Sequence, residues 1–89
     1  MKSRITKSFR KLHDRLPKEV KREARVAYRL WRADPHFPSL QFKQVSQSQP
    51  IYSVRIGIGW RALGLYEKGT VDWFWIGSHA AYDELLRRL

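Results

Sequence analysis

Four side chains in the C-terminal half of the chain are of types that can act on a phosphate. Arg55 and Arg61 carry guanidinium groups, whose paired N–H donors grip phosphate oxygens. His79 and Tyr82 stand three residues apart, the spacing that puts two side chains on the same face of a helix. Imidazole and phenol both carry protons, and a neighbouring guanidinium can stabilise the negative charge that develops on a phosphorane. The four residues are therefore candidates for chemistry at a phosphate that needs no metal ion.

Each of these side chains also has an ordinary structural role. A histidine at the start of a helix is often a surface or capping residue, and a tyrosine more often packs than reacts. Arginines on strands commonly pair with nearby carboxylates, for which Glu67 and Asp72 are available. The residue types alone leave the choice between chemistry and packing open.

The candidates lie on or beside segments that read as β-strands. Residues 40–45 (LQFKQV) alternate apolar and polar side chains, and residues 51–60 (IYSVRIGIGW) do so again up to a glycine-rich connection. Residues 60–67 and 70–76 are two further strands, joined by a hairpin turn at Lys68-Gly69. The order predicts a four-stranded antiparallel sheet.

The last hairpin brings two candidate residues together. Its turn joins the end of one strand to the start of the next, so the first residues of 60–67 and the last residues of 70–76 lie at the same end of the sheet. This predicts Arg61 beside His79, which begins a short closing helix after Gly77. The last strand is apolar on both sides, with Val71, Trp73 and Trp75 on one and Phe74 and Ile76 on the other. We therefore expect it to be central and covered on both faces.

Two amphipathic helices are predicted before the strands. The first has apolar residues at helical spacing: Ile5, Phe9, Leu12 and Leu16. Pro17 separates it from the second helix, which Asp34-Pro35 ends. The second helix has an apolar inner face of Val20, Ala24, Ala27, Tyr28 and Trp31, and an opposite basic stripe of Lys18, Arg22, Arg25, Arg29 and Arg32. The predicted fold class is α+β in a single domain over residues 1–89, with two N-terminal helices, the four-stranded sheet and a short C-terminal helix.

The charge points to a polyanionic partner. The 89 residues hold 18 Lys and Arg against 8 Asp and Glu, a net charge of +10. Residues 1–33 carry twelve of the basic side chains and only three of the acidic ones. Such a density favours binding to nucleic acid or to an acidic protein, although a solvated helix face is the simpler explanation.

Other classes of function are excluded or disfavoured by composition. The chain has no cysteine, and its histidines at 13 and 36 lack partners at ligand spacing, so we predict no metal site and no cofactor. No apolar run reaches the roughly 20 residues of a membrane span, and no signal sequence is present. We expect a soluble, cytoplasmic protein.

Taken together, the basic helices, LQFKQV, YSVRIGIGWRALGLYEKG and VDWFWIGSHAAYDELL resemble the RelE/ParE superfamily of toxins from bacterial toxin–antitoxin pairs. The resemblance covers nearly the whole chain, and the ending IGSHAAYDELL is its most specific part. It implies an α+β fold and neutralisation by a cognate antitoxin. In the RelE branch it also implies a ribosome-dependent endonuclease that cuts messenger RNA by attack of a 2′-hydroxyl on the adjacent phosphate, without a metal.

The resemblance also implies roles for single residues. Arg61 lies in a strand where RelE-like nucleases place an arginine that steadies the phosphate, and Arg55 lies in a strand where they place basic residues. His79 follows the strand-end glycine at a position where branches of the family use histidine or arginine, and Tyr82 is near a position of an aromatic residue. Lys43 is a weaker candidate for contact with the RNA backbone.

Two further readings remain open. The ParE branch inhibits DNA gyrase and shares the fold without the nuclease residues, so fold alone does not decide the activity. A basic binding module without catalysis is the other alternative.

Many members of the superfamily open with a strand before the first helix. Here MKSRITKSF has the pattern of a helix, so we expect that edge strand to be missing.

Overall fold

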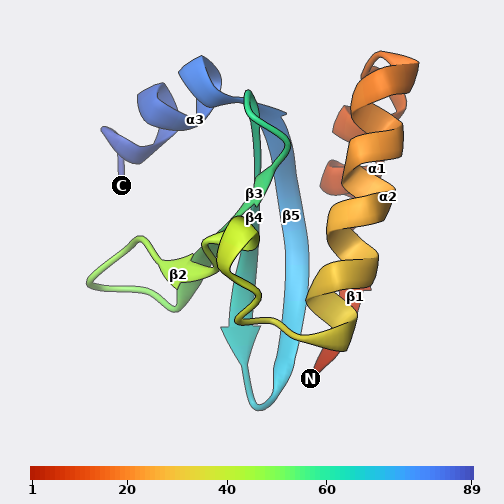
Figure 1. Ribbon diagram of the computed structural model, residues 1–89. Helices are drawn as coiled ribbons and strands as arrows, with labels where there is room; N and C mark the ends of the chain where they lie inside the picture. Colours follow the sequence, from red (N-terminus) through yellow and green to blue (C-terminus); the bar gives the residue numbers. More distant parts are fainter.

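The computed structural model describes residues 1–89 and contains one sheet of five strands in the order β1-β5-β4-β3-β2 (Figure 1). The strands are β1 (Lys2–Ile5), β2 (Lys43–Gln44), β3 (Ile51–Ile56), β4 (Trp60–Glu67) and β5 (Thr70–Ser78); the helices are α1 (Lys7–Asp14), α2 (Lys18–Ala33) and α3 (His79–Leu86), with a 3-10 turn, η1 (Pro38–Leu40). All pairs of neighbouring strands are antiparallel except β1 and β5, which are parallel. The predicted α+β class is confirmed.

The edge strand β1 was not expected from the sequence. The amide of Lys2 donates to the carbonyl of Gly69, and the amide of Thr6 donates to the carbonyl of Trp73, both at 3.0 Å. Helix α1 begins only after Thr6, whose hydroxyl caps it by accepting from the amide of Phe9. The prediction of four strands with a missing edge strand is therefore wrong at this point. Ile5 fits the apolar spacing of α1, but the backbone around it pairs with β5.

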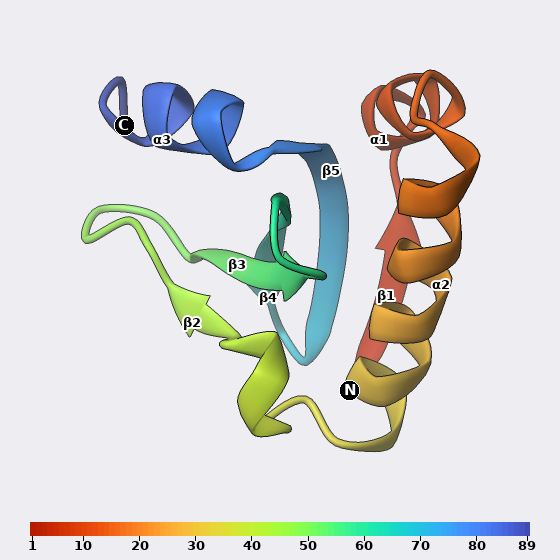
Figure 2. The ribbon, with the colours of Figure 1, turned by 45° about the horizontal axis from the view of Figure 1, so that its top comes forward.

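The helices cover the two faces of the sheet unequally, as Figure 2 shows: α1 and α2 lie on one face and α3 on the other. The larger core lies under α2, and its buried members are Ala27, Trp31, Leu40, Val54, Ile56, Ala62, Val71, Trp73 and Ile76. The smaller core lies under α3 and is built around Ile51, Leu63 and Tyr82. Burial of these side chains is the main favourable term that holds the helices to the sheet.

A β-bulge in β5 explains which of its side chains enter which core. Leu63 pairs with Trp75 but Gly64 pairs with Trp73, so Phe74 is an extra residue on β5. The bulge reverses the alternation: Trp75 packs in the smaller core, and Ile76 joins Trp73 in the larger one. The predicted grouping of Trp75 with Trp73 is therefore wrong. The expectation that this strand is covered on both faces is confirmed.

The strand predicted at residues 40–45 is much shorter in the structure. Only Lys43 and Gln44 pair with β3. Gln41 has a left-handed backbone with φ of 47°, which no regular strand allows. Leu40 is instead buried in the larger core as the last residue of η1.

None of the three helices combines the length and apolarity that a membrane span requires.

Candidate active site

Two arginines are cross-strand neighbours in the sheet. Arg55 in β3 and Arg61 in β4 are direct register partners, and residues so placed have Cβ atoms roughly 4.5–5.5 Å apart. The Nε of Arg55 donates to the carbonyl of Gly57 at 3.0 Å, and Nη1 of Arg61 donates to the carbonyl of Trp60 at 2.9 Å. Neither guanidinium forms an ion pair. Each guanidinium is therefore held by a main-chain oxygen and has no carboxylate within ion-pair distance, while Arg55 also borders a hollow with Glu23 of α2.

His79 stands at the junction of β5 and α3, at the same end of the sheet. Its amide donates to the carbonyl of Gly59 at 2.8 Å, which ties the start of α3 to the turn before β4. Helix α3 is capped by Ser78, whose hydroxyl accepts from the amide of Ala81. The imidazole is exposed, and its Nδ1 lies 3.0 Å from a carboxylate oxygen of Asp83, one turn along the helix. With Nδ1 directed at that carboxylate, Nε2 is the nitrogen left to meet a substrate.

Tyr82 is buried beneath this cluster. Only 6% of it is exposed, and its hydroxyl donates to the hydroxyl of Ser53 on β3 at 3.1 Å. The guanidinium carbon of Arg61 lies 5.7 Å from the centre of the tyrosine ring, and the His79 ring meets the same ring edge-on at 6.0 Å. The phenol is thus a support that Arg61 and His79 both contact, and its hydroxyl is engaged inside the protein.

The structure therefore brings Arg61, His79 and Tyr82 into one cluster with Arg55 opposite Arg61. Two members of the cluster were missed from the sequence. Asp83 follows His79 at a spacing of four residues, which on a helix places the two side chains together. Ser53 could not be identified as a member from the sequence, because a serine in a strand shows no role until the residue to which it hydrogen-bonds is known.

Chemically, the cluster has the parts for acting on a phosphate. A pair of guanidinium groups can hold two phosphate oxygens, and an imidazole whose other nitrogen faces a carboxylate can accept a proton. The exposed lysine of β2, Lys43, is the register partner of Ser53 and extends the same face of the sheet.

The basic stripe of α2 meets this cluster only at Arg22, which borders a hollow together with Arg55. All five of its side chains are exposed. Arg22 forms an ion pair with Glu19, and the guanidinium carbon of Arg32 lies 5.9 Å from the centre of the Tyr28 ring. The remaining members, Lys18, Arg25 and Arg29, form no ion pair. Apart from Arg22, the stripe is a charged outer surface that shares no hollow with Arg55, Arg61 or His79.

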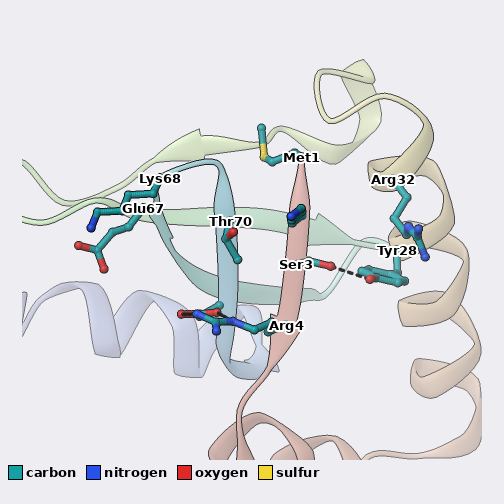
Figure 3. A pocket seen from close by; sticks show the side chains of 10 residues that line it. Met1, Ser3, Arg4, Tyr28, Arg32, Glu67, Lys68 and Thr70 are labelled. Atoms are coloured by element: carbon teal, nitrogen blue, oxygen red, sulfur yellow. Dashed lines mark hydrogen bonds and ion pairs between the residues drawn. The ribbon is translucent and has the colours of Figure 1, made fainter.

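A polar hollow of about 790 Å³ lies elsewhere, at the β1 edge of the sheet (Figure 3). It is bordered by Ser3, Arg32 and Lys68 among others, and none of Arg55, Arg61 and His79 reaches it. The hollow is open and contains no histidine, so size alone does not make it the candidate site.

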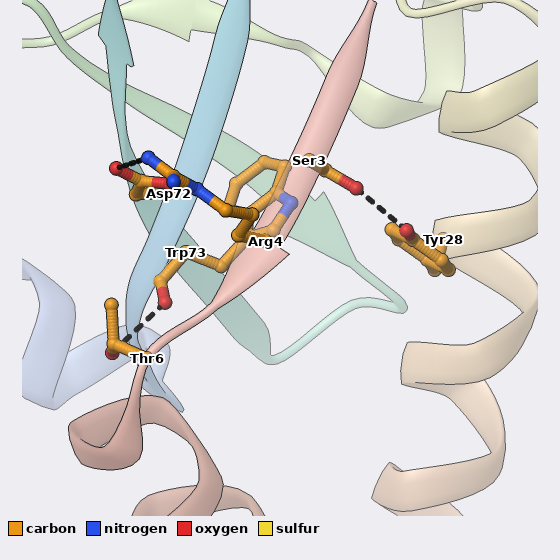
Figure 4. A network of polar contacts seen from close by, with 6 residues as sticks. All are labelled: Ser3, Arg4, Thr6, Tyr28, Asp72 and Trp73. Carbon is orange, nitrogen blue, oxygen red and sulfur yellow. Dashed lines mark hydrogen bonds and ion pairs between the residues drawn. The ribbon is translucent and has the colours of Figure 1, made fainter.

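Polar contacts beside that hollow fix β1 in place, as Figure 4 shows. Arg4 donates to both carboxylate oxygens of Asp72 in β5, at 2.7 and 3.0 Å. The hydroxyls of Ser3 and Tyr28 lie 2.6 Å apart and link β1 to α2. The hydrogen bond to Asp72, and then its charge, raise the pKa of the Arg4 guanidinium above its ordinary range. Asp72 is thereby occupied by Arg4 rather than by either arginine of the cluster.

Comparison with known proteins gives one family match and two structural matches. The family of ParE-like toxin domains matches residues 18–84. The fold is similar to that in the RelB–RelE antitoxin–toxin complex from Methanococcus jannaschii, with a TM-score of 0.72 and 12% identity over 91% of this chain and 95% of that chain. It is also similar to a copper-bound mutant toxin from Helicobacter pylori, with a TM-score of 0.62 and 21% identity over 91% and 97%. No curated protein matches the chain in sequence.

Proposed function

This chain belongs to the family of ParE-like toxin domains, within the RelE/ParE superfamily of type II toxins, and on that premise we propose that it is an endoribonuclease that cuts messenger RNA on the ribosome. The observation that carries the proposal is the pairing of Arg55 with Arg61 at the end of the sheet where His79 faces Asp83. The two guanidinium groups are free of carboxylate partners, which leaves them available to a phosphate.

The proposed reaction is attack of a ribose 2′-hydroxyl on the adjacent phosphorus. Nε2 of His79 accepts the proton of the 2′-hydroxyl while Asp83 holds the imidazole by Nδ1. A 2′-oxygen–phosphorus bond forms and the bond from phosphorus to the 5′-oxygen breaks. The products are a 2′,3′-cyclic phosphate and a 5′-hydroxyl, whose proton comes from water. Arg61 and Arg55 stabilise the negative charge on the phosphorane.

Tyr82 has a supporting part in this proposal. Its ring contacts both Arg61 and His79, and its hydroxyl is bonded to Ser53. It positions the two groups that meet the phosphate and transfers no proton itself. Lys43, further along the same face, is proposed to contact the RNA backbone.

The proposal is tested by expressing the chain alone and mapping transcript ends. We expect growth to stop and 5′-hydroxyl ends to accumulate within translated regions. His79→Gln keeps the size and hydrogen bonding of the side chain but removes proton transfer, which typically costs roughly 10² to 10⁴ in rate. The matched control is His36→Gln, at an exposed histidine outside the cluster, and it should cut like the wild type. A His79→Gln protein that folds and cuts at the wild-type rate would rule out His79 as the base.

Inhibition of DNA gyrase is the second candidate, and the ParE-like description of the matched family favours it. It predicts arrested growth with intact transcripts and accumulating DNA breaks. Measuring both in the same cells separates the two activities, because cut transcripts without DNA breaks support only the nuclease.

The proposed partners are a cognate antitoxin, the ribosome and messenger RNA. The RelE of similar fold was crystallised with the antitoxin RelB. For this chain we propose that the basic stripe of α2 binds ribosomal RNA phosphates or an acidic stretch of the antitoxin, because all five of its charged side chains are exposed.

A further inference from the structure

Ile58 is an unusual residue at the tip of the turn between β3 and β4. Of its surface 85% is exposed, whereas no other large apolar side chain is exposed by more than 55%. Turn tips ordinarily carry polar residues or glycine, and an isoleucine there gains nothing from packing in the folded protein. Gly57 and Gly59 flank it, and Gly57 has a positive φ of 56°. The backbone of the turn thus projects a bare aliphatic side chain into solvent.

The turn is held by residues of the candidate active site. The Nε of Arg55 donates to the carbonyl of Gly57 at 3.0 Å, and the amide of His79 donates to the carbonyl of Gly59 at 2.8 Å. On the opposite side, the carboxylate of Glu23 in α2 fills the space that a side chain on Gly57 would need. The backbone on both sides of Ile58 is therefore anchored, to Arg55 on one side and to His79 on the other.

We infer that Ile58 packs against a nucleobase next to the scissile phosphate and so contributes to binding of the RNA. The inference rests on the proposed nuclease function and adds to it a contact with a base, which arginines that grip a phosphate do not make. Aliphatic side chains, isoleucine among them, are inserted between partly unstacked base steps of DNA, and the splayed-out bases of single-stranded RNA present the same flat faces for packing. An aliphatic contact is tolerant of base identity, so Ile58 contributes to affinity more than to recognition of a particular sequence.

The test uses full-length protein and ribosomes programmed with an mRNA that carries 2-aminopurine beside the cleavage site. Truncating Ile58 to alanine should raise the KM for programmed ribosomes about tenfold, because most of the aliphatic surface is lost, with little change in the single-turnover rate at saturation. The 2-aminopurine fluorescence change on binding, measured with a 2′-O-methyl substrate that cannot react, should shrink in parallel. Ile58→Phe keeps an apolar surface and should restore binding.

Controls separate this contact from others. Ile5→Ala removes the same atoms from an isoleucine of β1 that is 51% exposed, and it should leave the KM unchanged. Equal melting temperatures of the variants exclude unfolding as the cause.

Three outcomes would overturn the inference. The first is cleavage by wild-type protein with an unchanged KM for Ile58→Ala. The second is an equal loss of affinity for vacant ribosomes, which would place the contact on the ribosome instead of the base. The third is the absence of cleavage by wild-type protein, which removes the proposed nuclease function as well and is therefore distinguishable from the other two.

Discussion

The hydroxyl of Tyr82 donates a 3.1 Å hydrogen bond to the hydroxyl of Ser53, which ties helix α3 to strand β3 directly beneath Arg61. A phenol that is buried and engaged in this way is poorly placed to exchange protons with a substrate. The contact with Ser53 therefore favours a structural role for Tyr82 over a role in proton transfer.

Tyr82→Phe therefore tests that support. The ring stays in the smaller core, but the hydroxyl of Ser53 loses its partner, and we expect the free energy of unfolding to fall by about 0.5–1.5 kcal/mol. The rate of RNA cleavage at saturating substrate should remain close to wild type. Denaturant melts and single-turnover assays measure the two quantities. A large loss of rate with unchanged stability would mean that the hydroxyl takes part in the chemistry.

Asp83→Asn tests how His79 is held. The amide cannot stabilise a positively charged imidazole as the carboxylate does, so the single-turnover rate should fall, by less than in His79→Gln. The matched control is Glu84→Gln, one residue along the same helix, where the carboxylate pairs with Arg87 and Arg88 instead. If both variants cut at the wild-type rate, the contact between His79 and Asp83 is only an exposed helix pair of the usual small value.

The basic stripe of α2 is tested by its dependence on salt. Lys18, Arg25 and Arg29 are exposed and form no ion pair, so their replacement by glutamine removes charge without breaking an internal contact. Ribosome affinity should weaken, and the slope of log K against log salt should flatten by about one unit for each lost phosphate contact.

The control for that experiment removes the same charge elsewhere. Glutamine at Lys7, Arg10 and Lys11, which are exposed residues of α1 without ion pairs, changes the net charge equally but lies outside α2. If the two triple variants have the same slope, the stripe has no specific part and acts only through net charge.

Two glycine substitutions test the packing around the bulge. A Cβ on Gly64 would lie 2.8 Å from Cε3 of Trp73, on the side chain that the larger core encloses, whereas a Cβ on Gly59 meets nothing within 4 Å. Gly64→Ala should lower the free energy of unfolding by about 1–3 kcal/mol through overpacking. Gly59→Ala should be neutral or slightly stabilising. If the two substitutions change the free energy of unfolding equally, the core around Gly64 can accommodate the added methyl group.

Asp72→Asn tests the attachment of β1. The hydrogen bonds with Arg4 raise the pKa of that guanidinium, so the stability that they contribute is present at lower pH and is lost only as pH rises through the raised pKa. Salt, which screens exposed pairs, is therefore the useful variable. The variant should melt below wild type in dilute buffer, and the difference should narrow in 1 M salt. If the difference in melting temperature between the variant and the wild type does not depend on salt, it arises from packing and not from the ion pair.

The helices and the last hairpin could be predicted because each has a local signal. The apolar spacing of α2 and the turn at Lys68-Gly69 are read directly from the residues, and the hairpin in turn predicts that Arg61 lies beside His79. The register of β4 and β5 confirms that Arg61 and His79 lie at the same end of the sheet, since Trp60 pairs with Ser78. What these residues do remains a prediction.

The features that sequence reasoning missed depend on distant partners. Ile5 continues the apolar spacing of α1, so nothing local marks β1 as a strand; it forms because the edge of β5 offers free backbone groups. The bulge at Phe74 is invisible for the same reason, since only pairing with β4 reveals the extra residue. Tyr82 is buried against Ile51 and Leu63, and its hydroxyl bonds to Ser53, which stands 29 residues earlier in the chain.

The pairing of β1 with β5 joins the two ends of the chain in sequence, with Arg4 and Asp72 separated by 68 residues. Contacts between such distant residues are slow to form, because closing a long loop costs entropy before the contact can offset it. During synthesis, β1 leaves the ribosome early but has no strand to pair with until β5 has also emerged. The last residues of β5 lead directly into His79, so the chain that completes the sheet is also the chain that completes the candidate site. A polypeptide that is still being translated is therefore without the assembled cluster until β4, β5 and the first turn of α3 have all emerged.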